Sequence, residues 1–345
     1  MKVSMNTSHT RDQRGLVSFM VTMIMMLVIS LIVIGFTQVT MRNRREQLDR
    51  QLSTQAFYAA ESGVNAAADI VKASLLTPSG VKAQNTCTGT SYPATMLNSN
   101  PSVGYTCLLV NPNVPSIVTN ANPQTSSVFP LNPVTSTGVA TKLTQLTFTW
   151  SAAQGETASN SGCQTLGHFP KNDASYRCAF GLLRVDLMRV VGGGLSAGTL
   201  AANTVTLYMQ PLASGHSSQT INNFNSPKAI IVGAQYNSTS KTYTATVSLA
   251  PAAQTTQYYM RITTLYRDSP RIVVDGVNVG TDVSFAGAQA IIDSTGKAQD
   301  VLRRVQVVVP LRQYDSIIPE GAVQSVADVC KQFSTYSGYY QSNCP

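Results

Sequence analysis

The sequence predicts an α+β protein, in which one long N-terminal helix is followed by a mostly antiparallel, β-rich globular body. Three observations predict this fold. An apolar stretch of membrane-spanning length occupies residues 16–36. Apolar and small residues then recur every three or four positions as far as residue 76. From residue 77 onward the chain changes to alternating or β-branched runs separated by Gly, Pro, Asn and Ser. These patterns are typical of a spanning helix, an amphipathic helix and strands joined by turns.

The apolar stretch is long enough to remain as a permanent anchor. The 27 residues from Gly15 to Met41 carry no charge, and the strongly apolar part, residues 16–36, is 21 residues long. At about 1.5 Å per residue, such a helix crosses the roughly 30 Å hydrocarbon core of a bilayer. A secretory signal peptide would have a shorter apolar core and a small-x-small cleavage site. The pattern therefore favours a transmembrane helix.

The helical pattern continues beyond the apolar stretch and a basic cluster at residues 42–45. Apolar and small residues fall on one helical face: Leu48, Leu52, Ala56, Ala59, Ala60, Gly63, Ala67, Val71 and Leu75. The run TPSG at residues 77–80 is a helix stop. We expect a single helix over residues 16–76, roughly 90 Å long, whose second half packs on the body.

The remainder, residues 77–345, is predicted to form an antiparallel β-rich domain. Strands are expected at residues 103–110, 142–152, 178–191, 203–210, 228–236, 241–250, 257–267, 271–277 and 303–311. Prolines and polar residues predict loops at residues 77–102 and 111–141. A third polar span, residues 211–227, marks the expected boundary if the body has two lobes.

Six cysteines predict disulfide bonds made outside the cytoplasm, because they accompany an N-terminal apolar segment and form no CxxC pair. Sequential pairing closes the shortest loops, although the six positions allow other pairings. The sequential pairs are Cys87–Cys107, Cys163–Cys178 and Cys330–Cys344. Only three histidines are present, at spacings unlike those of a zinc site, so no metal site is expected.

The formal net charge of +8 gives little support to nucleic-acid binding. Much of the basic surplus lies in the first fifteen residues and in the cluster around residues 42–50. Binding driven by counterion release needs a clustered basic patch, and the surplus left for the body is small and dispersed. Nucleic acid therefore remains an alternative partner without a sequence motif behind it.

Two short catalytic motifs occur at residues 192–198 but lack their structural context. GLSAG at 194–198 would make Ser196 a nucleophile. We expect a strand after it, where the nucleophile elbow needs a helix, and no acid separates Ser196 from the later His216. GGGLSA resembles a dinucleotide loop but lacks the helix and the acid about twenty residues on. The acids Asp275, Asp282, Asp293 and Asp300 form no calcium-loop motif. No enzymatic activity and no cofactor is expected.

The N-terminal region resembles a known family. A short hydrophilic leader ends at Gly15, the apolar stretch begins at the next residue, and an amphipathic helix continues from it. This arrangement resembles the class III leader peptides of type IV pilins and pseudopilins. The string TQAFYAAESGVNAA at residues 54–67 is similar to the helical segment of minor pilins of the PilX type. The resemblance covers roughly residues 11–70.

The resemblance implies a processing site and a specialised position. Residues 1–15 would be a leader removed by a prepilin peptidase after Gly15, and Leu16 would become the N-methylated N-terminus. Residues 16–36 would then serve as both membrane anchor and filament core. Met20 stands where major pilins carry a glutamate that pairs with the neighbouring subunit's N-terminus. An unpaired carboxylate there would be costly. Its absence implies a minor subunit at or near the tip.

The function that follows is structural. The chain is expected to be a minor type IV pilin-like subunit that displays its body for adhesion, assembly priming or DNA uptake. Its partners would be other pilin subunits, the prepilin peptidase, the membrane and a host or surface ligand. It would wait in the cytoplasmic membrane with its C-terminal domain outside, and then reach the cell surface in a pilus. The alternatives are a single-pass membrane-anchored surface protein that does not polymerise, and a pseudopilin of a type II-like secretion system.

Overall fold

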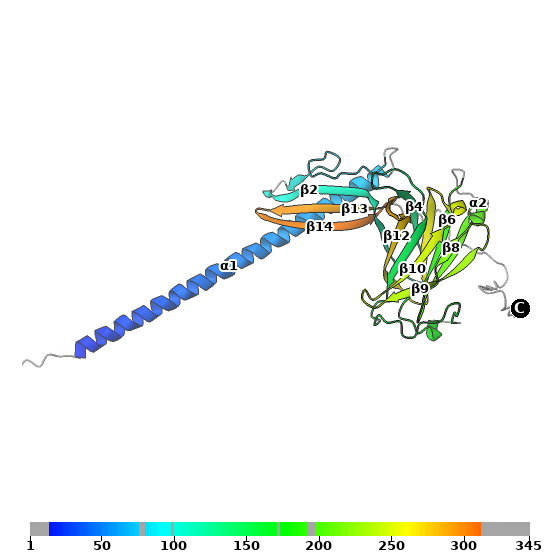
Figure 1. Ribbon diagram of the computed structural model, residues 1–345. Coiled ribbons are helices and arrows are strands. Elements are labelled where there is room, and N and C mark those ends of the chain that lie inside the picture. Colours follow the sequence, from blue (N-terminus) through cyan, green and yellow to red (C-terminus); the bar gives the residue numbers. More distant parts are fainter. Residues whose placement is uncertain (1–13, 76–79, 98–99, 171–172, 192–196, 312–345) are drawn as a thin grey trace, which may run out of the picture.

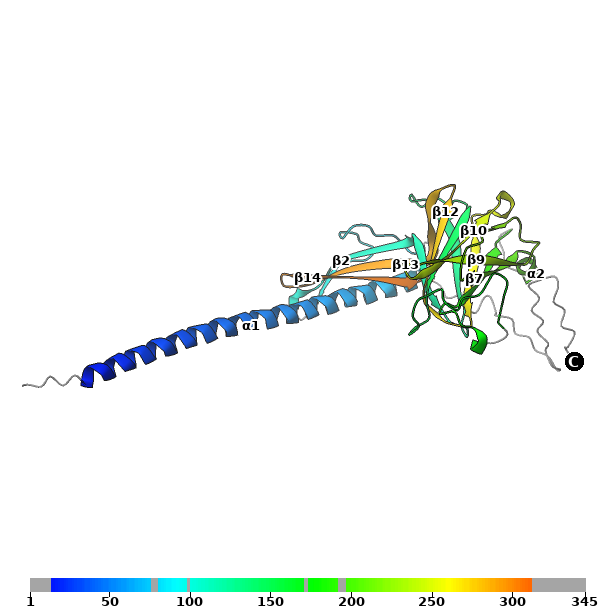
Figure 2. The same ribbon diagram turned by 60° about the horizontal axis from the view of Figure 1, so that its bottom comes forward.

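The computed structural model describes residues 14–75, 80–97, 100–170, 173–191 and 197–311 of the 345-residue chain. One helix, α1 (Arg14–Ser74), runs for 61 residues and carries a β-rich body at its C-terminal end (Figure 1). The two views show that its first half extends away from the body and its second half lies along a sheet (Figures 1 and 2). The predicted α+β fold is confirmed, and the helix ends two residues earlier than expected.

Fourteen strands are assigned in the described part of the chain. In chain order they are β1 (Thr95–Leu97), β2 (Asn100–Val114), β3 (Ser116–Ala121), β4 (Ser127–Val134), β5 (Gln145–Ser151), β6 (Leu182–Arg189), β7 (Thr204–Pro211), β8 (Gln219–Ile221), β9 (Ala229–Asn237), β10 (Thr242–Leu249), β11 (Tyr258–Leu265), β12 (Ser269–Asn278), β13 (Thr281–Ala298) and β14 (Val301–Pro310). The short helices are α2 (Ala197–Ala202), η1 (Asp173–Ser175) and η2 (Pro251–Ala253).

The first part of the body is a four-stranded antiparallel sheet in the order β1-β2-β13-β14, which we call the helix-bound sheet. It uses the C-terminal half of β13, and α1 packs on one of its faces, in contact with β2, β13 and β14. Residues of α1 and of the sheet share two small apolar clusters, one of which includes Val64, Val71, Tyr105 and Ile292. The second half of α1 is therefore an integral part of this sheet's core.

The second part, which we call the distal body, is a closed circuit of paired strands. The pairings run β4-β11-β6-β7-β9-β10-β5-β12-β13 and return from β13 to β4. All are antiparallel except β7 with β9; β8 adds a parallel pair with β10. The circuit encloses the largest apolar cluster, in which the buried Trp150 stacks on Tyr243 and donates its indole N–H to the carbonyl of Gly181 at 3.0 Å.

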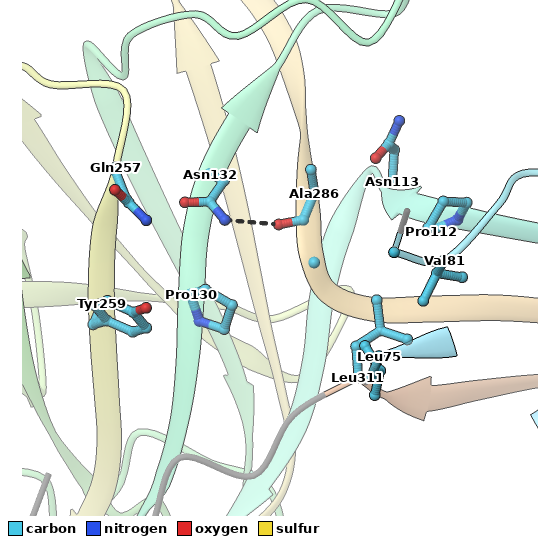
Figure 3. Close-up of a pocket in the computed structure, with 12 residues that line it drawn as sticks. Leu75, Val81, Pro112, Asn113, Pro130, Asn132, Gln257, Tyr259, Ala286 and Leu311 are labelled. Carbon is cyan, nitrogen blue, oxygen red and sulfur yellow. Dashed lines mark hydrogen bonds between the residues drawn. The ribbon is translucent and has the colours of Figure 1, made fainter. Parts of the chain in front are cut away.

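β13 belongs to both parts and joins them. Its residues 281–286 pair with β12 and β4, and its residues 285–286 and 291–298 pair with β2. The register shifts between Ala286 and Ile291, and Gly287 there has a φ of +76°, a conformation that suits glycine. The ribbon bends at Ala286 (Figure 3). This bulge turns the strand from the helix-bound sheet into the distal body.

The predicted loop at residues 111–141 is wrong, because it contains the end of β2 and the whole of β3 and β4. The prolines of β4 are accommodated because this strand changes partner along its length. Pro130 pairs with β11, and Pro133 pairs with β13. Each residue of β4 therefore pairs with a neighbouring strand on one side only. The missing N–H of a proline can face the unpaired side, where no strand needs it as a hydrogen-bond donor.

Three further expectations need correction or placement. β13, the longest strand, was not predicted, because its C-terminal half is rich in Ala, Gly and Ser. A short helix, α2, precedes β7, where a strand was expected to follow the glycine run directly. The polar span 211–227 contains β8 and joins β7 to β9, which pair with each other. That span therefore lies inside the distal body.

Two disulfides are formed in the described chain, Cys87–Cys107 and Cys163–Cys178. They are two of the three sequential pairs expected from the sequence. The first ties the segment before β1 to β2, and the second closes a loop at the side of the distal body. Each cross-link closing 15 to 20 residues is worth about 3 kcal/mol in the chain-entropy model. Cys330 and Cys344 lie outside the described residues.

Candidate functional site

The first half of α1 exposes a continuous apolar surface. Every large apolar side chain described between Phe19 and Met41 is exposed, with Phe19 at 71% and Phe36 at 75%. The most apolar stretch of this helix has none of its residues buried by the rest of the described chain. Exposed apolar surface of this extent needs a partner, either lipid or other apolar helices. This half of α1 is the candidate functional surface.

Three hydroxyls of this half are satisfied within the helix. The hydroxyls of Thr22, Thr37 and Thr40 donate to the carbonyls of Phe19, Val33 and Phe36 at 2.7–2.9 Å. Hydroxyls bonded in this way need no water, so they fit a hydrocarbon or a helix-packed environment. Of the residues singled out from the sequence, Gly15 and Leu16 lie in the first turn of α1, and Met20 is 62% exposed on the apolar surface.

A charged belt separates the apolar half from the sheet. Arg42, Arg44 and Arg45 are exposed, and Arg50 donates to Glu46 at 2.7 Å in an i,i+4 pair. Exposed pairs of this kind contribute only about 0.3–0.5 kcal/mol. The belt therefore contributes little to stability. Its charged side chains mark the point at which α1 would leave an apolar environment.

The second half of α1 approaches the sheet closely through small residues. Ala56, Ala59, Ala60, Gly63 and Ala67 are all buried against it. A Cβ placed on Gly296 of β13 would overlap backbone atoms of Ala56 and Ala60. Near the charged belt, the guanidinium of Arg303 donates to the hydroxyl of Ser53 at 2.8 Å. The apolar half of α1 is therefore continuous with a half that packs closely on the body.

The opposite face of this second half is also partly apolar. Phe57 and Tyr58 are 48% and 63% exposed, and their rings form an edge-to-face pair with centroids 5.9 Å apart. Ile70 is also exposed along this half of the helix. The helix thus buries one face in its own body and offers apolar groups on the other.

A cavity of about 330 Å³ lies at the junction of the two parts of the body (Figure 3). It is lined by apolar groups, including Leu75, Tyr259 and Leu311, and by side-chain amides. One of these amides, Asn132, donates to the carbonyl of Ala286 at 3.2 Å across the β13 bend. Among the described lining residues there is no carboxylate, histidine, cysteine or lysine. Its described lining therefore offers no carboxylate, imidazole, thiol or amine for acid–base or nucleophilic chemistry.

The buried tyrosines of the distal body are structural. Burial is the main cause that raises the pKa of Tyr176 and Tyr243, and it raises the pKa of Tyr258 to about 12. Each hydroxyl donates to a backbone carbonyl, of Phe180, Leu212 and Ala253 respectively. A phenol held neutral by burial and bonded to a carbonyl packs the core and does not act as a base.

The other residues singled out from the sequence are scattered. His216 is exposed in a loop, and Ser196 lies outside the described residues. Asp275 accepts a hydrogen bond from the Ser116 hydroxyl at 2.6 Å, and the buried Asp293 pairs with Arg304. Within the described chain, no group of three or more His, Cys, Asp or Glu side chains is placed to hold a metal ion.

The polar groups that sequence reasoning missed lie on the outer face of the distal body. Arg184 and Asp186 of β6 and Arg261 of β11 line one pocket of this face. Their alternation along each strand, Arg-x-Asp and Arg-x-Thr, was visible in the sequence, but the pairing of β6 with β11 was not.

Comparison with known proteins finds one match. Residues 14–65 match the PilX N-terminal family model. No curated protein and no solved structure matches the chain. The match covers the apolar half of α1, the charged belt and most of the sheet-bound half, and it ends before the body begins.

Proposed function

We propose that this chain, which has the PilX-type N-terminal segment of a pilin-like protein, is a minor structural subunit of a type IV pilus. In this proposal α1 anchors the chain in the cytoplasmic membrane and then packs among the helices of other subunits. The body is presented outside for adhesion, assembly priming or DNA uptake. The proposal assigns no chemical reaction to the chain, in keeping with the structural nature of the PilX-type family.

One observation carries the proposal. The apolar half of α1 is exposed along its whole described length, and it is continuous with a helical half that is built into the body. A purely lipid-embedded anchor would not require this continuity. A filament core does, because any force on the packed helix must reach the displayed body through a rigid connection.

The processing step belongs to the same proposal. A prepilin peptidase would cleave after Gly15, and Leu16 would become the methylated N-terminus. Both residues lie in the first turn of α1. Removal of residues 1–15 would leave a helix that is apolar from its first residue, as insertion among other apolar helices requires.

Met20 supports a position at or near the filament tip. No acidic residue occurs between Arg14 and Glu46, so the helix offers no carboxylate to a neighbouring N-terminus. A subunit inside the filament without this carboxylate would lose a charge-assisted contact with its neighbour's N-terminus. A subunit at the tip has no subunit above it, so it has no such N-terminus to pair with. We therefore place this chain at the end of the filament, with the body exposed.

The decisive experiment identifies the N-terminal peptide by mass spectrometry in membrane and sheared-surface fractions of the native organism. We expect a peptide that begins at methylated Leu16, and we expect it in the sheared fraction. An intact Met1 in every fraction would contradict the pilin proposal and favour the non-polymerising surface anchor. A processed chain that appears only with a secretion system, and whose deletion blocks secretion, would favour the pseudopilin alternative.

A further inference from the structure

Three arginines surround α1 just beyond its apolar half. Arg42, Arg44 and Arg45, which we call the arginine ring, are all exposed. Within the described residues, no hydrogen bond or ion pair engages any of their side chains. Arg50 differs, since it is paired with Glu46. The four arginines and two acids of residues 42–50 give this section of α1 a net charge of +2.

The members of the arginine ring point to different sides of the helix. At about 100° per residue, Arg44 and Arg45 lie roughly 200° and 300° around the helix axis from Arg42. Along the axis, the three positions span only about 4.5 Å. A small ligand or the surface of one protein would contact one side of a helix. A partner that meets all three arginines at once must surround the helix as a thin layer, as the headgroups of a bilayer do.

The depth of the ring also fits the surface of a bilayer. From Leu16 to Arg42 the helix rises about 39 Å, and a bilayer with its headgroups is about 40–45 Å thick. A helix that begins in one headgroup layer therefore brings the ring to the other. Residues 41–51 are all exposed, and contact with the body begins at the half-buried Leu52. Since Leu52 lies about 10 Å beyond Arg45 along the axis, the body leaves the ring open to lipid.

We infer that the arginine ring binds the headgroups of anionic phospholipids, in the leaflet on the body's side of the membrane. A guanidinium group donates paired N–H groups to a phosphate, which an ammonium group cannot do. Every phospholipid has a phosphate, but an anionic one also keeps a net negative charge, which a positive section of helix attracts. These contacts would fix the depth of α1 in the membrane and hold the body about 10 Å above the headgroups.

The orientation of the chain does not account for this ring. Basic clusters beside a spanning helix normally favour the cytoplasmic side, whereas the disulfide-bonded body is proposed to lie outside. The ring then stands where the positive-inside rule disfavours it, so a contact on that side has to compensate. The inference rests on the membrane-anchoring step of the proposed function, and it does not depend on polymerisation.

The test measures which lipid the full chain holds at its surface in phosphatidylcholine vesicles. Electron paramagnetic resonance gives the share of a spin-labelled lipid that is bound by the protein, first for labelled phosphatidylglycerol and then for labelled phosphatidylcholine. We expect phosphatidylglycerol to be preferred at least about threefold at about 0.05 M sodium chloride, because each basic residue near the surface attracts anionic lipid. The preference should largely disappear at about 1 M, where the Debye length falls to about 3 Å.

A triple variant locates the contact on the ring. Arg42→Gln, Arg44→Gln and Arg45→Gln together should lower the preference at least about twofold, because they remove the unpaired cations. The leader's basic residues are the same in parent and variant, so the difference between the two isolates the ring. The control removes three positive charges from exposed positions of the distal body and should leave the preference unchanged; its substitutions are Lys142→Gln, Lys241→Gln and Arg271→Gln.

The other outcomes would overturn the inference in distinguishable ways. If the inserted chain held both lipids equally, or if the ring variant kept the parent's preference, the ring would have no lipid role. The anchor and the pilin proposal would then still stand. Replacing sodium chloride by sodium phosphate at equal ionic strength should not change the preference, and a selective loss in phosphate would indicate a site for free phosphate. A chain that failed to insert into either bilayer would contradict the anchor as well.

Discussion

At the scale of single residues, the clearest constraint is the contact between Gly296 and α1. A Cβ at this position would overlap backbone atoms of Ala56 and Ala60, and backbone cannot move aside as a flexible side chain can. We predict that Gly296→Ala pushes α1 from the sheet and lowers the free energy of unfolding by about 1–3 kcal/mol. Chemical unfolding of the full chain in detergent measures this.

The matched control is Gly35→Ala in the apolar half of α1. No atom lies within 4 Å of a Cβ built there, so nothing has to move. Alanine also favours a helix more than glycine does. Unfolding of this variant should occur at the same denaturant concentration as the parent or slightly higher. Equal destabilisation by both substitutions would contradict the close-packing explanation.

The buried tyrosines predict loss of stability at high pH. The pKa of Tyr258 is raised by burial to about 12, above its value of about 10 in an unfolded chain. The unfolded state therefore loses this proton first as the pH rises. The stabilisation is fully present below about pH 10 and is lost between about pH 10 and 12.

The measurement is chemical unfolding at pH 8, 9, 10 and 11, combined with the absorbance of tyrosinate. We expect similar unfolding free energies at pH 8 and 9 and a fall above pH 10. Tyr258→Phe should reduce the slope of that fall. It should also cost about 1–2 kcal/mol at pH 8, because the Ala253 carbonyl and the Thr255 N–H lose their bonds to the hydroxyl. Full ionisation of the tyrosines at pH 10 in the folded chain would refute this.

At the scale of elements, α1 presents different faces to different partners. Its buried face needs small residues to reach the sheet, while its outward face keeps Phe57 and Tyr58 exposed. We predict that Phe57→Ala with Tyr58→Ala lowers incorporation into sheared filaments severalfold, because interfaces rely on buried aromatic groups. Unfolding of the isolated chain should change little, since both side chains are exposed.

Val139→Ala is the control for this prediction. Val139 is 62% exposed on the body and apolar, like the helix pair, but it belongs to the turn after β4 and not to α1. It should leave both incorporation and unfolding unchanged. If the aromatic pair could be removed with no loss of incorporation, the outward face of this half of α1 would not be an assembly contact.

Helix α1 also shows which features could be predicted from the sequence and which could not. The helix and its buried face were predictable because a period of three to four residues persists over nearly thirty positions. The exception is Leu48, which fits the period but lies beyond the sheet and is 57% exposed. Periodicity identifies a face, whereas the length of the partner decides how much of that face is buried.

The strands that the sequence did not predict have residue types that fit the elements packed against them or paired with them. β13 carries Ala290, Ser294, Gly296 and Ala298 where α1 presses on it, and such small residues weaken the usual strand pattern. β4 carries prolines that a strand paired on both sides would exclude. The pocket on β6 and β11 was missed for a related reason, since the opposition of Arg261 and Asp186 depends on pairing between strands distant in sequence.

At the scale of the whole molecule, anchor and body are separable in their packing. The described apolar side chains of residues 19–41 are exposed, whereas the apolar clusters begin at Leu52 and use only later residues. The apolar half of α1 therefore adds nothing to the body's core. In the proposed function, it is the surface that lipid and other subunits would cover.

We therefore predict that a chain lacking residues 1–41 folds as a soluble protein. Removal of the exposed apolar surface eliminates the reason to aggregate, and the charged belt then forms the new N-terminus. Its thermal midpoint should lie within a few degrees of that of the full chain in detergent, and both described disulfides should form. Calorimetry and thiol titration measure these properties. An insoluble product, or a much lower thermal midpoint, would mean that the apolar half of α1 stabilises the body. A soluble and stable product that is absent from filaments would show that the apolar half serves assembly, while the second half of α1 holds the displayed body.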